Sequence, residues 1–220
     1  VIAPDLRGFG RSSVTKGAVT MGEMADDLDA MLDRLGIGER VVLCGLSMGG
    51  YVAFQFWARH AQRLGGLVLC DTRAAPDSPE TAQARRATAN QVVAEGPQAL
   101  VDGMIPRLFA KRTLAESPEL IEQTRRVILA ASPEGIAAAA RGMAERPDMT
   151  PLLPQITCPA LLIVGSEDVI STVEEMRTIA ERLPNARLVE IAGAGHMAPL
   201  EQPKTVNAAI RAWLAECVAG

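Results

Sequence analysis

The sequence contains few histidines and aromatic residues, and it has no long hydrophobic run. Aromatic residues make up 3% of its 220 residues, and only two histidines occur, His60 and His196. No run of 18 apolar residues predicts a membrane-spanning helix, and no basic and then apolar leader predicts a signal peptide. We therefore expect a cytoplasmic protein that has no membrane partner.

Cysteine pairs and an excess of positive charge are also absent. The four cysteines, Cys44, Cys70, Cys158 and Cys217, show no CxxC or zinc-type spacing, and two of them lie inside apolar runs. We expect reduced core cysteines and no metal site. The formal net charge is −4 and no basic stripe occurs, which argues against a nucleic-acid partner.

What is present is an alternation of strand-like and helical patterns. Methionine and leucine recur every three or four residues over 21–35, with Thr20 as a predicted N-cap and Gly36 as the residue that follows the helix end. Similar periodicity returns over 172–183 and 204–219. This order predicts an α/β fold with a mostly parallel sheet covered by helices. The predicted strands are 1–3, 40–45, 67–70, 160–164 and 187–191.

Residues 73–150 interrupt the alternation, because they contain no convincing strand. Three Ser-Pro-Glu triplets, beginning at Ser78, Ser117 and Ser132, each place a capping hydroxyl before a proline at the first helical position. We therefore predict a helical insertion, which divides the chain into a first core part (1–72), a helical cap (73–150) and a second core part (151–220).

The most informative motif is Gly45-Leu46-Ser47-Met48-Gly49-Gly50, which lies between a predicted strand and a predicted helix. Gly-x-Ser-x-Gly in this position is the nucleophile elbow, in which a serine is exposed on a sharp, strained turn. We expect Gly45 and Gly49 to remove the Cβ atoms that would collide there. Ser47 is therefore the candidate nucleophile.

A serine nucleophile needs a base, and the base needs a carboxylate to orient it. His60 lies about three helical turns beyond Ser47 and cannot fold back to it, whereas His196 follows the strand predicted at 187–191. Asp168 follows the strand at 160–164 and is the preferred acid. Asp71 and Glu167 remain alternatives. The chain order Ser47, Asp168, His196 is the order expected of this elbow-containing fold.

Four segments together resemble the α/β-hydrolase superfamily, and within it the group of carboxylesterases, enol-lactonases and cofactor-free haloperoxidases. They are residues 1–12 (VIAPDLRGFGRS), 45–50 (GLSMGG), 165–168 (GSED) and 193–199 (GAGHMAP). The resemblance implies a triad of Ser47, Asp168 and His196. It also implies a backbone oxyanion donor at Met48 and a cap that roofs the pocket and sets substrate choice.

The sequence departs from the resembling family at its beginning. Such proteins carry about three strands and a His-Gly-rich loop upstream of the segment that matches Val1, and the loop supplies a second oxyanion donor. These N-terminal strands are missing here, so we expect a gap in the sheet between the strand at 1–3 and the strand at 40–45. Direct pairing of these strands, or strand exchange in a homodimer, would close it.

The predicted activity is serine-dependent hydrolysis of a small carboxylic ester or lactone through an acyl-enzyme, without metal or organic cofactor. The alternatives are a carbon–carbon bond hydrolase or perhydrolase with the same triad, and a catalytically weak, truncated or ligand-binding member of the fold. Apolar residues of the cap could line the substrate pocket, although helices more often use such residues for their own core. The candidate lining residues are Met104, Leu108, Phe109 and Met143 in the cap, together with Met197, which follows His196.

Overall fold

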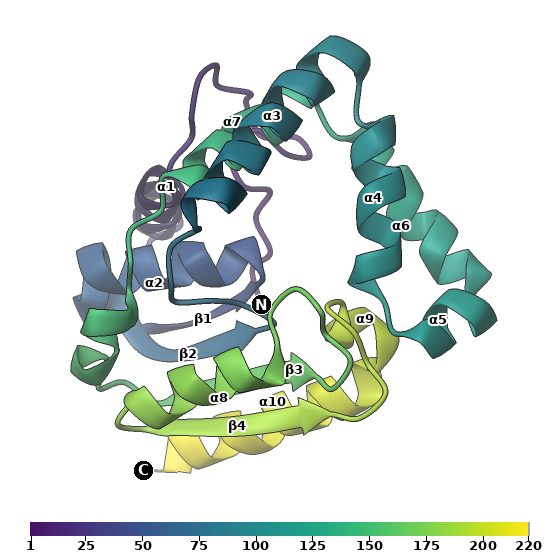
Figure 1. Cartoon of the computed structure of the whole chain (residues 1–220). Coiled ribbons are helices and arrows are strands. Elements are labelled where there is room, and N and C mark those ends of the chain that lie inside the picture. The colour runs from purple at the N-terminus through teal and green to yellow at the C-terminus, as the bar shows by residue number, and fades with distance from the viewer. Residues whose placement is uncertain (220) are drawn as a thin grey trace.

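The computed structural model describes the backbone of residues 1–219 and the side chains of residues 1–217, and it contains one sheet of four parallel strands (Figure 1). The strands are neighbours in chain order, and each pairs in parallel with the next. The predicted parallel α/β fold is therefore confirmed. The strands are β1 (Val41–Leu46), β2 (Leu64–Cys70), β3 (Ala160–Gly165) and β4 (Ala186–Ile191).

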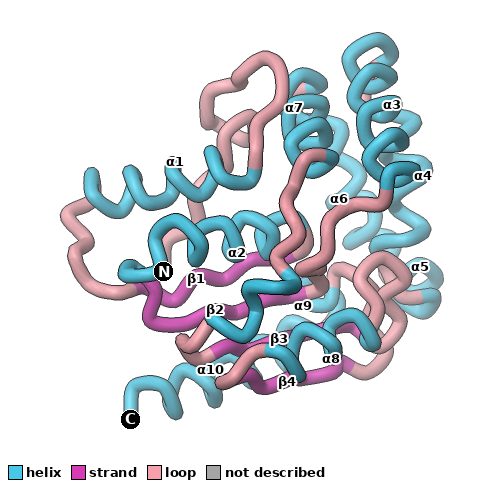
Figure 2. The backbone as a smooth tube through the Cα atoms, turned by 60° about the vertical axis from the view of Figure 1, so that its left-hand side comes forward, coloured by secondary structure: helices cyan, strands magenta, loops and turns pink. Residues whose placement is uncertain are grey.

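Helices cover both faces of this sheet. The helices α1 (Met21–Arg34), α2 (Met48–His60) and α8 (Val173–Arg182) bury their apolar side chains in one core cluster. The last helix, α10 (Pro203–Ala219), lies on the opposite face (Figure 2). There Val206 and Trp213 are buried in a second core cluster. Three short elements complete the core: η1 (Ala61–Arg63), η2 (Thr150–Gln155) and α9 (Ala198–Glu201).

The predicted bounds of α1 are confirmed at both ends. Thr20 and Glu23 form a reciprocal capping box, in which each side chain accepts a hydrogen bond from the other residue's backbone N–H. Gly36 has a φ of 68°, the left-handed conformation that commonly follows a helix. Local sequence signals therefore mark both ends of this helix.

Residues 73–150 form helices and contain no strand. Figure 1 shows two groups: α3 and α7 lie side by side above the core helices, and α4, α5 and α6 extend beyond the carboxyl ends of the strands. Ser78 and Ser132 cap α3 and α7 through their side chains, whereas Ser117 precedes α6 without a side-chain cap. The helices are α3 (Pro79–Glu95), α4 (Gln98–Leu108), α5 (Lys111–Glu116), α6 (Pro118–Ala130) and α7 (Pro133–Ala144).

The two segments that connect this insert to the core are joined to each other by a buried ion pair. Asp77 precedes α3 and Arg146 follows α7, and the two side chains are 1% and 4% exposed. The Arg146 guanidinium also lies 4.3 Å from the ring centre of Tyr51 on α2. A buried charge is costly without a partner. The contacts among Asp77, Arg146 and Tyr51 therefore favour one fixed position of the two connecting segments against α2.

The prediction of a strand at 1–3 is wrong. These residues are irregular and exposed, with Val1 and Ile2 among the most exposed hydrophobic residues. The β-branched side chains of Val1 and Ile2 favour a strand, but a strand also needs a hydrogen-bonded neighbour, and among the described residues none lies beside them. The expected gap therefore does not interrupt the sheet. Instead, β1 is an edge strand among the described residues.

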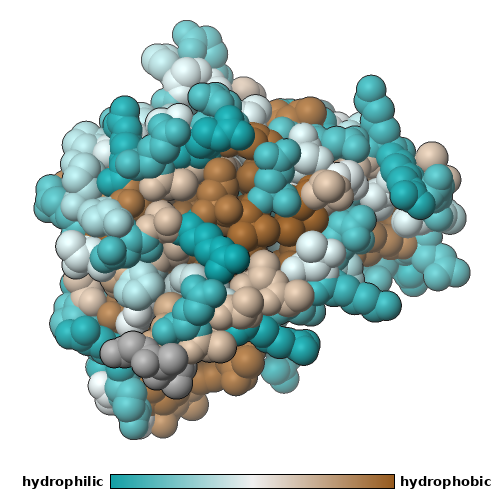
Figure 3. Space-filling model, turned by 90° about the horizontal axis from the view of Figure 1, so that it is seen from below, coloured by the Kyte–Doolittle hydropathy of each residue, from teal (hydrophilic) through white to brown (hydrophobic). Residues whose placement is uncertain are grey.

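The face of β1 is only partly covered. Val42 is 41% exposed and Cys44 is exposed, and Figure 3 shows hydrophobic side chains gathered at the surface on the side seen from below. Among the described helices, none combines the length and the apolar character needed to cross a membrane.

Candidate active site

The turn between β1 and α2 holds Ser47 in a strained backbone conformation. Its φ is 52° and its ψ is −113°, values that a residue with a side chain rarely adopts. A Cβ atom on Gly45 would lie 2.2 Å from the carbonyl oxygen of Gly49. The sharp turn therefore requires a glycine at position 45, as the motif predicts.

The second steric requirement falls on Gly50 rather than on Gly49. A Cβ atom at Gly49 would meet nothing within 4 Å in the described structure, whereas one at Gly50 would lie 2.3 Å from the Thr72 hydroxyl oxygen. Gly49 already lies in the first turn of α2, where its backbone is helical. The close approach is between α2 and the residue that follows β2, which the spacing of the motif does not reveal.

His196 and Asp168 are paired in a buried position. Nδ1 of His196 lies 2.8 Å from Oδ2 of Asp168, and the two residues are 2% and 6% exposed. The other carboxylate oxygen of Asp168 accepts hydrogen bonds from the backbone N–H groups of Ile170 and Ser171, at 2.7 and 3.1 Å. Three donors thus fix this carboxylate, which leaves Nε2 of His196 available for another partner.

The loops after β3 and β4 are joined to each other, which explains why this pair forms. Glu167 N–H donates to the carbonyl of Ala194 at 2.8 Å, and Gly193 N–H donates to the hydroxyl of Ser166 at 2.9 Å. A Cβ atom on Gly165 would lie 2.1 Å from the carbonyl oxygen of Gly195, so the loop that carries His196 bends back over the end of β3.

Ser47, like this pair, follows the carboxyl end of a strand of the sheet. Ser47 N–H donates to the carbonyl of Cys70 at 2.9 Å, and the Thr72 hydroxyl donates to the carbonyl of Ser47 at 2.7 Å. Neighbouring strands are about 5 Å apart, so the ends of β1 and β3 are separated by about 10 Å, which two side chains can span. Among the described residues, Ser47 Oγ makes no hydrogen bond with His196. Catalytic hydrogen bonds are often long before substrate binds.

The backbone beside Ser47 offers a site for negative charge. Met48 is the first residue of α2, so its N–H has no acceptor within the helix, and the positive end of the helix dipole lies there. Met48 is the residue whose N–H the family resemblance implies as an oxyanion donor.

Hydrogen bonds also connect the His196 loop to the helical insert. Met197 N–H donates to the carbonyl of Leu108 at 2.9 Å. The carboxylate of Glu201 accepts from the N–H groups of Gly195 and Ala110, at 2.7 and 2.9 Å, and from the hydroxyl of Thr113. One side chain therefore joins the loop next to His196 to the junction between α4 and α5.

The remaining candidates have other surroundings. His60 lies between Asp26 and Asp29 at the far end of α2, with Nε2 2.8 Å from Asp26. Glu167 accepts from Lys111 N–H at 3.3 Å and is turned toward the insert. Asp71 is fully buried, and burial is the main reason that its pKa is raised to about 8, with the neighbouring Asp168 adding to the effect. Of the three carboxylates considered, only Asp168 contacts His196.

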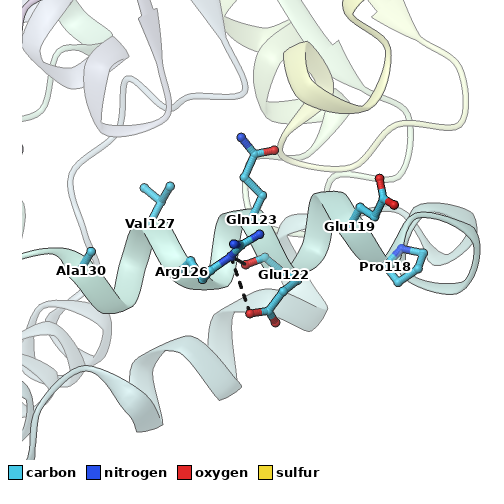
Figure 4. Close-up of a pocket in the computed structure, with 7 residues that line it drawn as sticks. All are labelled: Pro118, Glu119, Glu122, Gln123, Arg126, Val127 and Ala130. Atoms are coloured by element: carbon cyan, nitrogen blue, oxygen red, sulfur yellow. Dashed lines mark hydrogen bonds and ion pairs between the residues drawn. The ribbon is translucent and has the colours of Figure 1, made fainter.

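The expected pocket-lining residues lie mostly in hydrophobic packing. Leu108 and Phe109 are buried in the insert's own core, and Met104 and Met197 pack against it, whereas Met143 packs against the main core. An open depression runs along α6, and Figure 4 shows its lining. It contains none of the predicted site residues: its lining is Pro118, Glu119, Glu122, Gln123, Arg126, Val127 and Ala130.

Thr72 and Glu201 are parts of this site that the sequence analysis missed. Each acts by contacting backbone groups that are far away in the chain, such as the carbonyl of Ser47 and the N–H of Ala110. No local spacing or composition marks such contacts.

Comparison with known proteins assigns this arrangement to a class. The alpha/beta hydrolase fold family matches residues 1–203, and the chain belongs to this family. A structure of a thermophilic esterase from Thermogutta terrifontis, with malate bound, is 53% identical in sequence, with a TM-score of 0.96 over 97% of this chain and 79% of that one.

Two enol-lactonases are also similar. The structure of the enol-lactonase from Burkholderia xenovorans LB400 is 33% identical, with a TM-score of 0.88 over 96% of this chain and 79% of that one. The sequence of 3-oxoadipate enol-lactonase 2 from Acinetobacter baylyi is 31% identical over 212 residues, which are 96% of this chain and 77% of that protein.

Proposed function

We propose that the protein is a serine hydrolase that cleaves small carboxylic esters or lactones through an acyl-enzyme intermediate. The observation that carries the proposal is a strained serine at a strand-to-helix turn, on the same sheet edge as a buried His196–Asp168 pair. The named activities of the similar proteins, esterase and enol-lactonase, support this substrate class.

The proposed reaction uses three side chains and one backbone group. Ser47 Oγ attacks the acyl carbon, and its proton moves to Nε2 of His196, whose imidazolium form is stabilised by Asp168. The Met48 N–H donates to the oxyanion, and His196 then protonates the leaving oxygen. In the second half, His196 deprotonates a water molecule, which attacks the acyl carbon and releases Ser47 and the carboxylic acid.

In this proposal the insert at 73–150 is a cap that selects the substrate. Its helices α4, α5 and α6 extend beyond the carboxyl ends of the strands (Figure 1). Ser47 and His196 follow those ends in the chain, and none of the three proposed triad residues belongs to the insert. We expect its apolar side chains to determine which acyl and alcohol groups are accepted.

The test is stoichiometric labelling of the whole chain by a fluorophosphonate, combined with a series of p-nitrophenyl esters of increasing chain length. Ser47→Ala and His196→Ala should each lower turnover by about 10⁶, and the double variant should lose little more, because triad members act as a unit. His60→Ala is the matched control and should keep full turnover. Retention of more than a tenth of the activity by either single variant would refute the assignment.

A further inference from the structure

Asp71 is a buried carboxyl group that the proposed reaction does not use. It directly follows β2, is 0% exposed and has a φ of 46°, the only positive φ besides that of Ser47 among the described residues other than glycine. Its N–H donates to the carbonyl of Ile163, and its Oδ1 accepts from Gly165 N–H at 2.8 Å. Both contacts hold it against the end of β3, next to the loop that carries Asp168.

The second oxygen of this carboxyl group lacks a donor. Oδ2 of Asp71 is buried and has no hydrogen-bond partner among the described residues. Asp71 is bonded to Ile163 and Gly165 at the end of β3, and Asp168 follows three residues later, so that its carboxyl group acts on Asp71 both through its charge and as a side-chain hydrogen-bond partner. Two ionised carboxylates can only accept, so contact between them is repulsive. The contact becomes a hydrogen bond when one of the two holds a proton.

The surroundings indicate which of the two is protonated. Asp168 has three donors, namely the N–H groups of Ile170 and Ser171 and the ring of His196, whereas Asp71 has only Gly165 N–H. Donors stabilise the ionised form of a carboxyl group. Asp168 is therefore the better anion, and the proton belongs on Asp71.

The other titratable groups near Asp71 favour the same state. Asp168 on the β3 loop and Glu201 on α9 both raise the pKa of Asp71 through their negative charge, in addition to the larger effect of burial. Cys70 precedes Asp71 in the chain, and its own pKa is raised by its contact with Cys44 and by burial. His196, which can become cationic, is bound to Asp168.

We propose that Asp71 is a positioning residue, a neutral carboxylic acid whose Oδ2–H donates to Asp168. This inference rests on the proposed triad and adds a fourth member to it. The donated hydrogen bond fixes the Asp168 carboxylate toward His196. It also disperses the carboxylate's charge, which limits the basicity of the imidazole ring.

Two substitutions separate the donation of a hydrogen bond to Asp168 from the mere filling of space at position 71. The amide of Asp71→Asn can reproduce both contacts, because its oxygen accepts from Gly165 N–H and its NH₂ group donates to Asp168. Asp71→Leu keeps the same branched shape, with methyl groups in place of the oxygens, but donates nothing. The readout is kcat/KM for p-nitrophenyl acetate against pH, in particular the pH at which activity falls on the acidic side, which reports protonation of His196.

We expect Asp71→Asn to keep kcat/KM within about threefold of the wild type with an unchanged acidic limb. Asp71→Leu should lose about 10- to 100-fold, as expected for one lost hydrogen bond to a charged group. In Asp71→Leu the fall of activity on the acidic side of the pH profile, the acidic limb, should move to higher pH. The charge of Asp168 is then less dispersed and favours protonation of His196 more strongly. A downward shift of the limb in Asp71→Asn would show that a negative charge had been removed, and would overturn the proposal. A loss in Asp71→Leu without any shift would show a merely structural role and would overturn it too.

A second measurement does not depend on catalysis and remains possible if Asp71→Leu fails to fold. Infrared spectra at pH 6 should show the C=O stretch of a protonated carboxylic acid in the wild type, and this band should be missing in Asp71→Asn. A wild type without this band refutes the proposal for Asp71. A wild type that shows the band but is not labelled by fluorophosphonate refutes the proposed function instead.

Discussion

A proton held by folded Asp71 should make the stability of the protein depend on pH. The pKa of Asp71 is raised from an ordinary 3.8 to about 8 in the folded protein, with burial as the main cause. Between these two pH values the folded chain binds a proton that the unfolded chain has released. The contribution of this group is therefore fully present below pH 3.8 and is lost as the pH rises toward 8.

The size of the effect follows from the one proton involved. Each pH unit inside this window lowers the free energy of unfolding by about 1.4 kcal/mol, so the wild type should lose about 2.7 kcal/mol from this group between pH 5 and pH 7. Asp71→Asn does not titrate. Its stability relative to the wild type should therefore rise by that amount over the same interval and become constant above about pH 8.

Urea unfolding of both proteins at pH 5, 6, 7 and 8 measures this difference directly. Asp102→Asn is the control: Asp102 is exposed, and its pKa is lowered by hydrogen bonds from Gln98 and Arg125. That group is ionised in both states between pH 5 and pH 7, so its variant should show no pH-dependent gain. A difference between wild type and Asp71→Asn that stays constant from pH 5 to pH 7 would refute the reasoning.

Three further substitutions test the site. Asp168→Asn should lower kcat by about 10⁴ while the protein stays folded, because the amide favours the wrong tautomer of His196, and a larger loss in Asp71→Asn would identify Asp71 as the acid instead. Glu201→Ala should lower kcat at least about tenfold, because the loop next to His196 loses the anchors at Gly195 and Ala110 and a small displacement of a reacting group is costly. The control for it is Glu122→Ala on α6, and equal activity of the two variants would contradict the role of Glu201. Gly45→Ala should destabilise the protein far more than Gly49→Ala, since only the first places Cβ 2.2 Å from a carbonyl oxygen, and equal urea midpoints would disprove this.

The elements that the sequence predicts well are those defined by local patterns. The four strands of the sheet are short apolar runs, and α1 is bounded by Thr20 and Gly36, whose capping roles depend only on neighbouring residues. The same reasoning fails at Val1–Ala3, because an apolar run becomes a strand only where a neighbour supplies hydrogen bonds. Composition alone does not reveal whether such a neighbour is present.

The candidate site shows the same division. The elbow and the loops after the strands point to Ser47, Asp168 and His196, because each follows a strand and parallel strands end at one edge. The roles of Gly50 and Glu201 depend instead on contacts with Thr72 and Ala110, which lie 22 to 91 residues away. The proton on Asp71 depends on how many donors surround each carboxylate, which only the folded structure defines.

The contacts of Glu201 and Met197 with the insert limit how far the protein can be treated as modular. A helical insert grafted from another hydrolase would have to supply an N–H group and a hydroxyl where Ala110 and Thr113 now stand, and a carbonyl in place of that of Leu108. Without them, the loop next to His196 would lose its anchors, even though no residue of the proposed triad had been exchanged. Mutations in the insert and in this loop should therefore have non-additive effects, so that libraries for new specificity are best built across both segments together.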